Sequence, residues 1–130
     1  MAQTSRTSSS GGGAGQLILD KIAGETISAL KLVISDGNNE VIVADPNGAF
    51  EGAQVLGIAL NSANVGEEVR VLTQGALQDS SFAFSINSQL YLGTNGFVTD
   101  TPPATGHRVL VAKAIETDEI YLEIEETIIL

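Results

Sequence analysis

Short runs of β-branched and other apolar residues, separated by turn-forming residues, recur along most of the chain. The clearest pair is Lys31–Ser35 and Glu40–Ala44, which flank the tetrapeptide Asp36-Gly37-Asn38-Asn39. Because glycine and asparagine tolerate positive φ, this spacing predicts an antiparallel hairpin. Further strands are expected at 17–19, 55–60, 68–72, 82–87, 89–92, 97–99, 108–114, 119–124 and 128–130. Many short strands joined by tight turns predict an all-β fold, either a small β-sandwich or a barrel, with at most one helical turn within 24–30.

The second half of this pattern is similar to the first. Leu32-Val33-Ile34 followed by Asp36-Gly37 matches Leu90-Tyr91-Leu92 followed by Asn95-Gly96. The apolar run 55–60 matches 109–115, and Val69-Arg70-Val71 matches Ile120-Tyr121-Leu122. The match predicts two duplicated units of about 50 residues, each a hairpin, a return strand and a closing strand. Chance similarity between two successions of short strands is the alternative.

The first sixteen residues differ in composition from the rest. Residues 2–16 read AQTSRTSSSGGGAGQ, in which Arg6 is the one charged residue and no aliphatic side chain is larger than alanine. Such a segment cannot fill a core, so we expect an extended Ser/Gly-rich arm over 1–16 and a single β domain over 17–130. A fully extended arm of this length spans up to about 55 Å, enough to contact neighbouring proteins. A linker or a cloning remnant is the alternative interpretation.

The charge of the chain limits its partners. Six Lys and Arg stand against sixteen Asp and Glu, which gives a formal net charge of −10. Such a surface repels phosphate, so neither nucleic acid nor an anionic membrane is an expected partner. No apolar run approaches the roughly 20 residues of a membrane span, and no signal peptide is expected. Cysteine is absent, which excludes disulfides and thiolate sites.

No residue pattern predicts catalysis. His107 is the only histidine and is expected to be a surface strand residue, so metal sites that need several histidines are excluded. No serine lies in a GxSxG context. The acids within Glu116–Glu126 alternate with apolar residues, which is typical of a solvated strand face, and the chain has no tryptophan to support a glycosidase cleft. We therefore expect no enzymatic activity, no metal and no cofactor.

Several strings of the sequence resemble those of one group of viral proteins. They are Ala23-Gly24-Glu25, Asp36-Gly37, Ala44-Asp45-Pro46, the runs 55–60 and 66–71, Leu90-Tyr91-Leu92-Gly93, Asn95-Gly96 and Thr101-Pro102-Pro103. Together they are similar to small structural proteins of tailed bacteriophages, of the capsid decoration, head fibre or cement type. The resemblance covers about residues 23–130. It implies a virion component with an all-β fold and a trimeric assembly.

These observations lead to one functional expectation with two alternatives. The protein is expected to be a non-enzymatic virion protein on the capsid exterior, bound to the major capsid protein. The expected capsid-binding residues are those of the arm, namely Thr4, Ser5, Arg6, Thr7, Ser8, Ser9 and Ser10. The expected self-association residues are the apolar end of the chain, Ile128, Ile129 and Leu130. The alternatives are a tail or baseplate fibre component, and a glycan-binding adhesin that stacks sugar rings on outward-facing Tyr91 and Tyr121.

Overall fold

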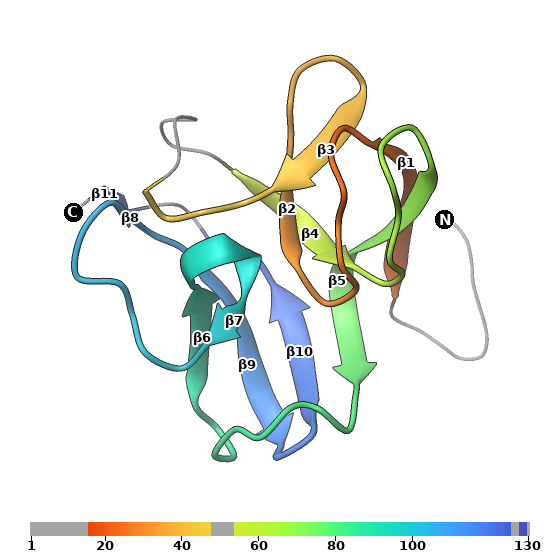
Figure 1. Ribbon diagram of the computed structural model, residues 1–130. Helices are drawn as coiled ribbons and strands as arrows, with labels where there is room; N and C mark the ends of the chain where they lie inside the picture. Colours follow the sequence, from red (N-terminus) through yellow and green to blue (C-terminus); the bar gives the residue numbers. More distant parts are fainter. Residues whose placement is uncertain (1–15, 48–53, 126–127, 130) are drawn as a thin grey trace.

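The computed structural model describes residues 16–47, 54–125 and 128–129, and within them the chain is almost entirely β (Figure 1). The strands are β1 (Leu17–Ala23), β2 (Leu32–Ser35), β3 (Glu40–Val43), β4 (Val55–Ala59), β5 (Glu68–Gln78), β6 (Gln89–Leu92), β7 (Val98–Thr99), β8 (His107–Arg108), β9 (Leu110–Glu116), β10 (Glu119–Glu123) and β11 (Ile128–Ile129). One 3-10 turn, η1 (Thr94–Gly96), lies between β6 and β7. The expected all-β fold is confirmed.

Five strands close into a small barrel. The order is β1-β3-β2-β4-β5, and β1 also pairs with β5, which completes the ring. β1 runs parallel to β3 and antiparallel to β5. The expected hairpin is its β2–β3 edge, with positive φ at Gly37 and Asn39. The barrel is filled by small and β-branched side chains: Ala23, Ile27, Val33, Val41, Ala59, Ala63, Val69 and Val71.

The long strand β5 carries the sheet out of the barrel. Its first part pairs with β1 and β4, whereas Gln74–Gln78 pair with β10. Gly75 has φ +127°, a backbone conformation that L side chains rarely adopt, near the point where β5 changes partners. Beyond β10 the sheet continues as β9, β6 and β7 and forms the lower part of the molecule in Figure 1.

The strand order agrees with the predicted repeat. One half of the sheet reads β5-β4-β2-β3 and the other reads β10-β9-β6-β7, so the hairpin, return strand and closing strand recur in the same order. In both halves the return strand pairs with the first hairpin strand across a bulge, after Val33 in one and after Leu90 in the other. The bulges therefore equate Val33 with Leu90, one residue away from the match of Leu32 with Leu90 made by sequence.

One apolar core joins the two halves. It contains buried residues from the outer side of the barrel and from the lower sheet: Leu32, Ile34, Ala44, Val55, Ile58, Leu72, Leu90, Leu92, Val109, Val111, Ala112, Ala114, Ile120 and Leu122. The barrel wall thus has an apolar cluster on each side. This explains why β4 is apolar on both faces, as its sequence indicated.

One expected strand is divided, and another is absent. The segment 24–30, for which at most one helical turn was expected, contains none, because Ile27 instead exchanges two backbone hydrogen bonds with Ala63, at 2.8 and 2.9 Å. The expected strand 108–114 is divided into β8 and β9 at Val109, because Arg108 pairs with β11 whereas Leu110 pairs with β6. Both differences depend on pairing partners that are distant in sequence.

The expected strand at 82–87 is wrong. The segment crosses the turn end of the β9–β10 hairpin (Figure 1) and donates to it from Phe84 and Asn87, to the carbonyls of Thr117 and Ala114. No ladder forms, because β10 is already paired with β5 and β9, and β9 with β10 and β6. The period-two alternation has another cause: Phe82 and Phe84 pack against the shared core while their neighbours face solvent.

Candidate functional site

The expected capsid-binding residues Thr4–Ser10 lie outside the described residues, but the point where the arm joins the barrel is described. The Gln16 side chain donates a 2.8 Å hydrogen bond to the carbonyl of Ala76. The Thr73 hydroxyl donates to the carbonyl of Leu17 at 3.1 Å. The strand that follows pairs with β5 from Leu17 to Ile22 and with β3 at Ile22 and Ala23. The arm is therefore attached to a strand held on both sides.

The expected self-association residues are described only in their backbone pairing. β11 pairs antiparallel with β8, with Ile128 opposite Arg108 and Ile129 opposite His107. Leu130 and the side chains of the two isoleucines lie outside the described residues. The expectation that this apolar end contacts sister subunits stays a prediction.

His107 connects the lower sheet to the barrel. It is half-buried on β8, and its backbone nitrogen donates to the carbonyl of Pro46 at 2.8 Å. Its Nδ1 lies 3.0 Å from the same oxygen. The neighbouring Gly106 has no room for a side chain, because its Cβ would lie 2.2 Å from the carbonyl oxygen of Pro46. We assign His107 a structural role at the junction.

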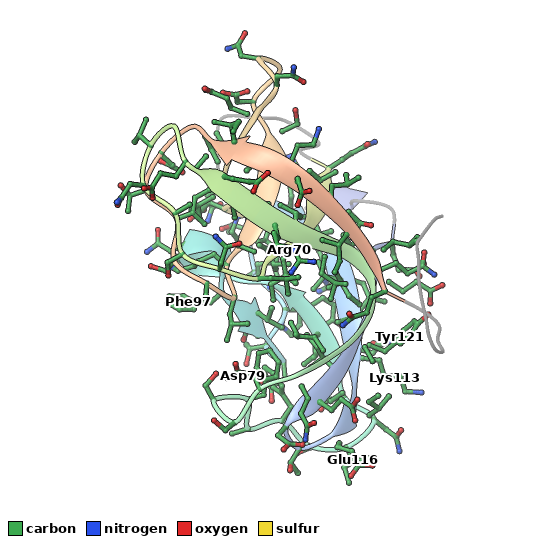
Figure 2. All side chains as sticks on the ribbon, turned by 90° about the vertical axis from the view of Figure 1, so that its right-hand side faces the viewer. Arg70, Asp79, Phe97, Lys113, Glu116 and Tyr121 are labelled. Atoms are coloured by element: carbon green, nitrogen blue, oxygen red, sulfur yellow. The ribbon has the colours of Figure 1, made fainter. Side chains whose placement is uncertain are left out.

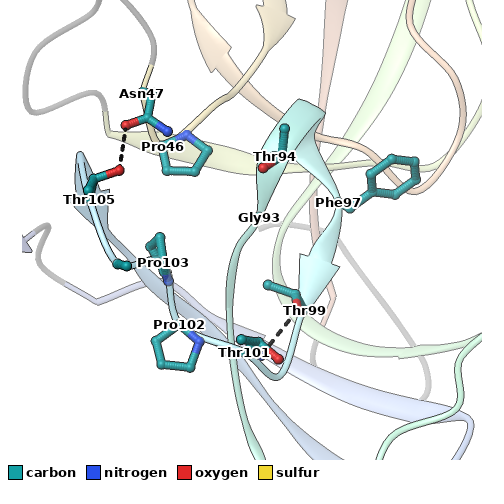
Figure 3. Close-up of a pocket in the computed structure, with 11 residues that line it drawn as sticks. Pro46, Asn47, Gly93, Thr94, Phe97, Thr99, Thr101, Pro102, Pro103 and Thr105 are labelled. Atoms are coloured by element: carbon teal, nitrogen blue, oxygen red, sulfur yellow. Dashed lines mark hydrogen bonds between the residues drawn. The ribbon is translucent and has the colours of Figure 1, made fainter.

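A shallow groove of about 470 Å³ opens where this junction meets the β6–β7 turn (Figure 3). Its lining residues are Pro46, Asn47, Gly93, Thr94, Phe97, Thr99, Thr101, Pro102, Pro103, Ala104 and Thr105. None of these side chains is ionisable. The Thr105 hydroxyl donates to the Asn47 side-chain oxygen at 3.3 Å across one end of the groove.

The aromatic ring beside this groove is not turned into it. Phe97 is 58% exposed, and in Figure 3 its ring points away from the hollow. The Lys31 ammonium lies 3.7 Å from the centroid of that ring and donates to the carbonyl of Asn95 at 2.8 Å. These contacts fasten the β6–β7 turn to the barrel. The sequence reasoning did not identify the groove, since its lining comes from three separate loops.

The acids of Glu116–Glu125 lie on the surface, as expected of a solvated strand face. Glu116, Glu123 and Glu125 are exposed, whereas Ile120 and Leu122 between them are buried. Within the described ranges, no three His, Cys, Asp or Glu side chains gather closely enough to hold a metal ion.

Asp79 accepts two hydrogen bonds that lower the pKa of its carboxyl group. The Ser81 hydroxyl donates to its carboxylate at 2.7 Å and the Ser81 backbone nitrogen at 2.9 Å. These hydrogen bonds stabilise the charged form, the hydroxyl most strongly, and hold the pKa of Asp79 below its ordinary value of 3.8. The pair closes the turn that follows β5, so its function is local.

Both tyrosines of the chain face outward on the lower sheet. Strand register places Tyr121 of β10 opposite Lys113 of β9, and Lys113 opposite Gln89 of β6, so all three share one face. Tyr91 follows two residues after Gln89 and therefore faces the same way. We call this surface the tyrosine face, and its members are Gln74, Ala76, Gln78, Gln89, Tyr91, Lys113, Glu116, Glu119, Tyr121 and Glu123. Figure 2 shows Tyr121 and Lys113 projecting beside each other.

Comparison with known proteins adds no family to this description. The sequence matches no protein-family model, and a search of curated proteins finds no significant match. Across the described ranges, the structure contains no helix that is both long and apolar enough to span a membrane.

Proposed function

We propose that this protein is a non-enzymatic structural component of a tailed-phage virion, which decorates and stabilises the exterior of the capsid. Its partner in this proposal is the major capsid protein, and the protein acts as a homotrimer. The sequence resemblance suggests this class of protein. The observation that supports it most directly is the attachment of the arm to β1, the strand that closes the barrel.

The geometry of β1 suits an anchor. A load on the arm would reach a strand that is paired over six residues with β5 and over two with β3. The hydrogen bonds of both ladders would then share the load along the strand direction. An arm bound to the shell would thus hold the β domain firmly at the surface. A protein that binds only the assembled shell stabilises that shell by its binding free energy, and many copies add avidity.

The charge of the protein fits an exterior position. With a formal net charge of −10, it is repelled by packaged DNA and gains nothing from contact with it. The same charge keeps the free protein soluble at the concentrations that decoration of a shell requires.

Deleting Ala2–Gly15 tests the role of the arm. The truncated protein is expected to keep its circular dichroism spectrum and melting temperature, because β1 and the Gln16 contact are retained. Its occupancy on purified particles, measured by quantitative gel densitometry, is expected to fall at least tenfold, which corresponds to about 1.4 kcal/mol. A variant with residues 2–15 in scrambled order separates sequence-specific binding from the effect of length. If the truncated protein saturates particles at wild-type affinity, the arm is not the anchor.

A double substitution tests self-association. Ile128→Ser with Leu130→Ser is expected to convert a trimer into a folded monomer, measured by light scattering coupled to size exclusion. Removing two large apolar side chains from a contact costs about 1.5–3 kcal/mol each. Ile115→Ser, at a side chain that is 36% exposed on β9, is the matched control and should leave the trimer intact. A wild-type protein that is already monomeric would contradict the proposed assembly.

A further inference from the structure

We infer that the tyrosine face is a carbohydrate-binding surface for a neutral, linear oligosaccharide of about three sugar units. The inference adds a second activity to the proposed structural role and does not depend on it. It rests on the arrangement of tyrosine, glutamine and charged side chains over four neighbouring strands.

Tyr91 is held in place by its neighbours before any ligand arrives. Both tyrosines are half-buried, so each ring is supported by the sheet while part of it meets solvent. The Tyr91 hydroxyl donates to the Gln89 side-chain oxygen at 3.1 Å, and the Arg108 guanidinium carbon lies 5.9 Å from the centroid of the Tyr91 ring. A ring fixed in this way loses little conformational entropy on binding. Both rings offer an apolar surface with a polar tip, which suits a pyranose ring.

The spacing of the tyrosines fits a short chain of sugars. Tyr121 and Tyr91 are two strands apart across the sheet and two residues apart along it. This corresponds to about 10 Å across and about 7 Å along, and so to about 12 Å between the two positions. Lys113 lies between them, and Gln89 beside it, where each can hydrogen-bond a sugar hydroxyl.

The charge of the face selects a neutral ligand. Lys113 and the neighbouring Arg108 lie among three acids, Glu116, Glu119 and Glu123, so the face carries a small net negative charge. An acidic sugar placed along β10 would meet Glu119 and Glu123 and be repelled. Neutral hydroxyl groups, in contrast, can donate to the carboxylates and accept from the cations and amides.

The area of the face argues against a protein as its occupant. The face is four strands wide, at about 4.8 Å for each strand, and as long as Glu119–Glu123, which gives about 19 Å by 14 Å, or about 270 Å². A stable protein contact needs about 800 Å² on each partner. The apolar side chains of Val111, Ile120 and Leu122 are also buried in the shared core, whereas Ile115 of β9 is 36% exposed. A small hydroxyl-rich ligand therefore fits this surface better than a second copy of the chain.

The absence of tryptophan provides a direct readout. Because Tyr91 and Tyr121 are the only tyrosines, all of the tyrosine fluorescence of the protein comes from this face. The intact protein is titrated with a panel of neutral trisaccharides of glucose, galactose, mannose and N-acetylglucosamine, with sialyllactose as the acidic comparison. At least one neutral trisaccharide is expected to change the emission saturably and to bind more tightly than sialyllactose.

Variants measured by isothermal titration calorimetry localise the binding. Tyr121→Ala is expected to raise the Kd at least about tenfold, as the loss of one stacking ring implies. Val65→Ala, at a side chain 64% exposed in the β4–β5 turn of the barrel, should leave the Kd unchanged. Gln89→Ala, at an exposed position, serves as the second variant if Tyr121→Ala fails to fold, and is expected to weaken binding.

Three results would overturn the inference. The first is the absence of a saturable change with every neutral trisaccharide. The second is a Kd that Tyr121→Ala and Gln89→Ala do not alter, which would place the sugar elsewhere. The third is tyrosine emission that changes with protein concentration alone while no sugar affects it, which would assign the face to contacts between copies.

Discussion

At the scale of single residues, several positions require glycine because neighbouring atoms leave no room for a Cβ. Gly57 on β4 is an example: a Cβ at this position would lie 2.1 Å from the carbonyl oxygen of Leu72 on β5. Its φ is not in the left-handed region, so the constraint is steric alone. Because both sides of β4 contact an apolar core, the strand has no room to move away. The glycine permits the close approach of β4 and β5.

This contact supports a quantitative prediction. Gly57→Ala is expected to lower the free energy of unfolding by about 3 kcal/mol or more, because backbone atoms must shift to admit the methyl group. Gly37→Ala is the control: its Cβ would meet nothing within 4 Å, so the positive φ of +88° sets its cost at about 1 kcal/mol. Urea denaturation followed by circular dichroism measures both. Equal losses for the two variants would contradict the steric explanation.

At the scale of elements, local sequence predicted strands well where their partners are close in sequence. The hairpin of β2 and β3 was predicted correctly because its turn residues and its apolar runs agree. The segment 82–87 shows the limit of this reasoning. Its alternation reports burial of Phe82 and Phe84, which does not require a ladder partner, and the adjacent strands have both edges occupied. The hydrophobic pattern of a segment cannot show whether the edges of the neighbouring strands are already paired.

Hydrogen exchange distinguishes such a segment from a strand. Phe84 and Asn87 donate backbone hydrogen bonds to Thr117 and Ala114, whereas the amides of Ala83, Ser85 and Ile86 make no hydrogen bond within the described structure. We expect these three amides to exchange at least tenfold faster than the first two in exchange measured by NMR. Similar, strong protection of all five would contradict the loop conformation and indicate a strand pairing absent from this structure.

The candidate sites depended on the same distant contacts. The sequence indicated that Tyr121 faces outward, but the register of β10, β9 and β6 is what brings Tyr121, Lys113 and Gln89 together. The groove is formed by three loops from both halves of the chain, so no local motif could have predicted it. Its Thr101-Pro102-Pro103 string contributed to the family resemblance without indicating a cavity.

At the scale of the whole molecule, the shared core predicts one cooperative unfolding transition. Leu122 of β10 is fully buried in the same cluster as Leu32 of the barrel. Leu122→Ala is expected to lower the free energy of unfolding by about 2–5 kcal/mol, and to do so for the barrel and for the lower sheet together. The measurement is hydrogen exchange of the slowest amides, which exchange only through global unfolding. The free energy of unfolding is obtained separately from the amides of β2 and from those of β9.

The control for this prediction is an exposed apolar residue. Val65→Ala is expected to change the stability by less than about 0.5 kcal/mol, because Val65 is 64% exposed. Two separate unfolding transitions, or a barrel whose stability Leu122→Ala does not alter, would contradict the prediction and show that the two halves are energetically independent.

Because β5 is continuous, it limits where the chain can be cut without loss of the fold. Its residues up to Leu72 close the barrel, and Gln74–Gln78 begin the ladder of the lower sheet. The border between the barrel and the lower sheet therefore lies inside a hydrogen-bonded strand and not in a loop. Cutting the chain there would leave each fragment with an exposed edge and half of the common core. We expect proteolytic nicks, permuted termini and inserted peptides to be tolerated instead at exposed turns such as Asp36–Asn39, and not where the barrel passes into the lower sheet.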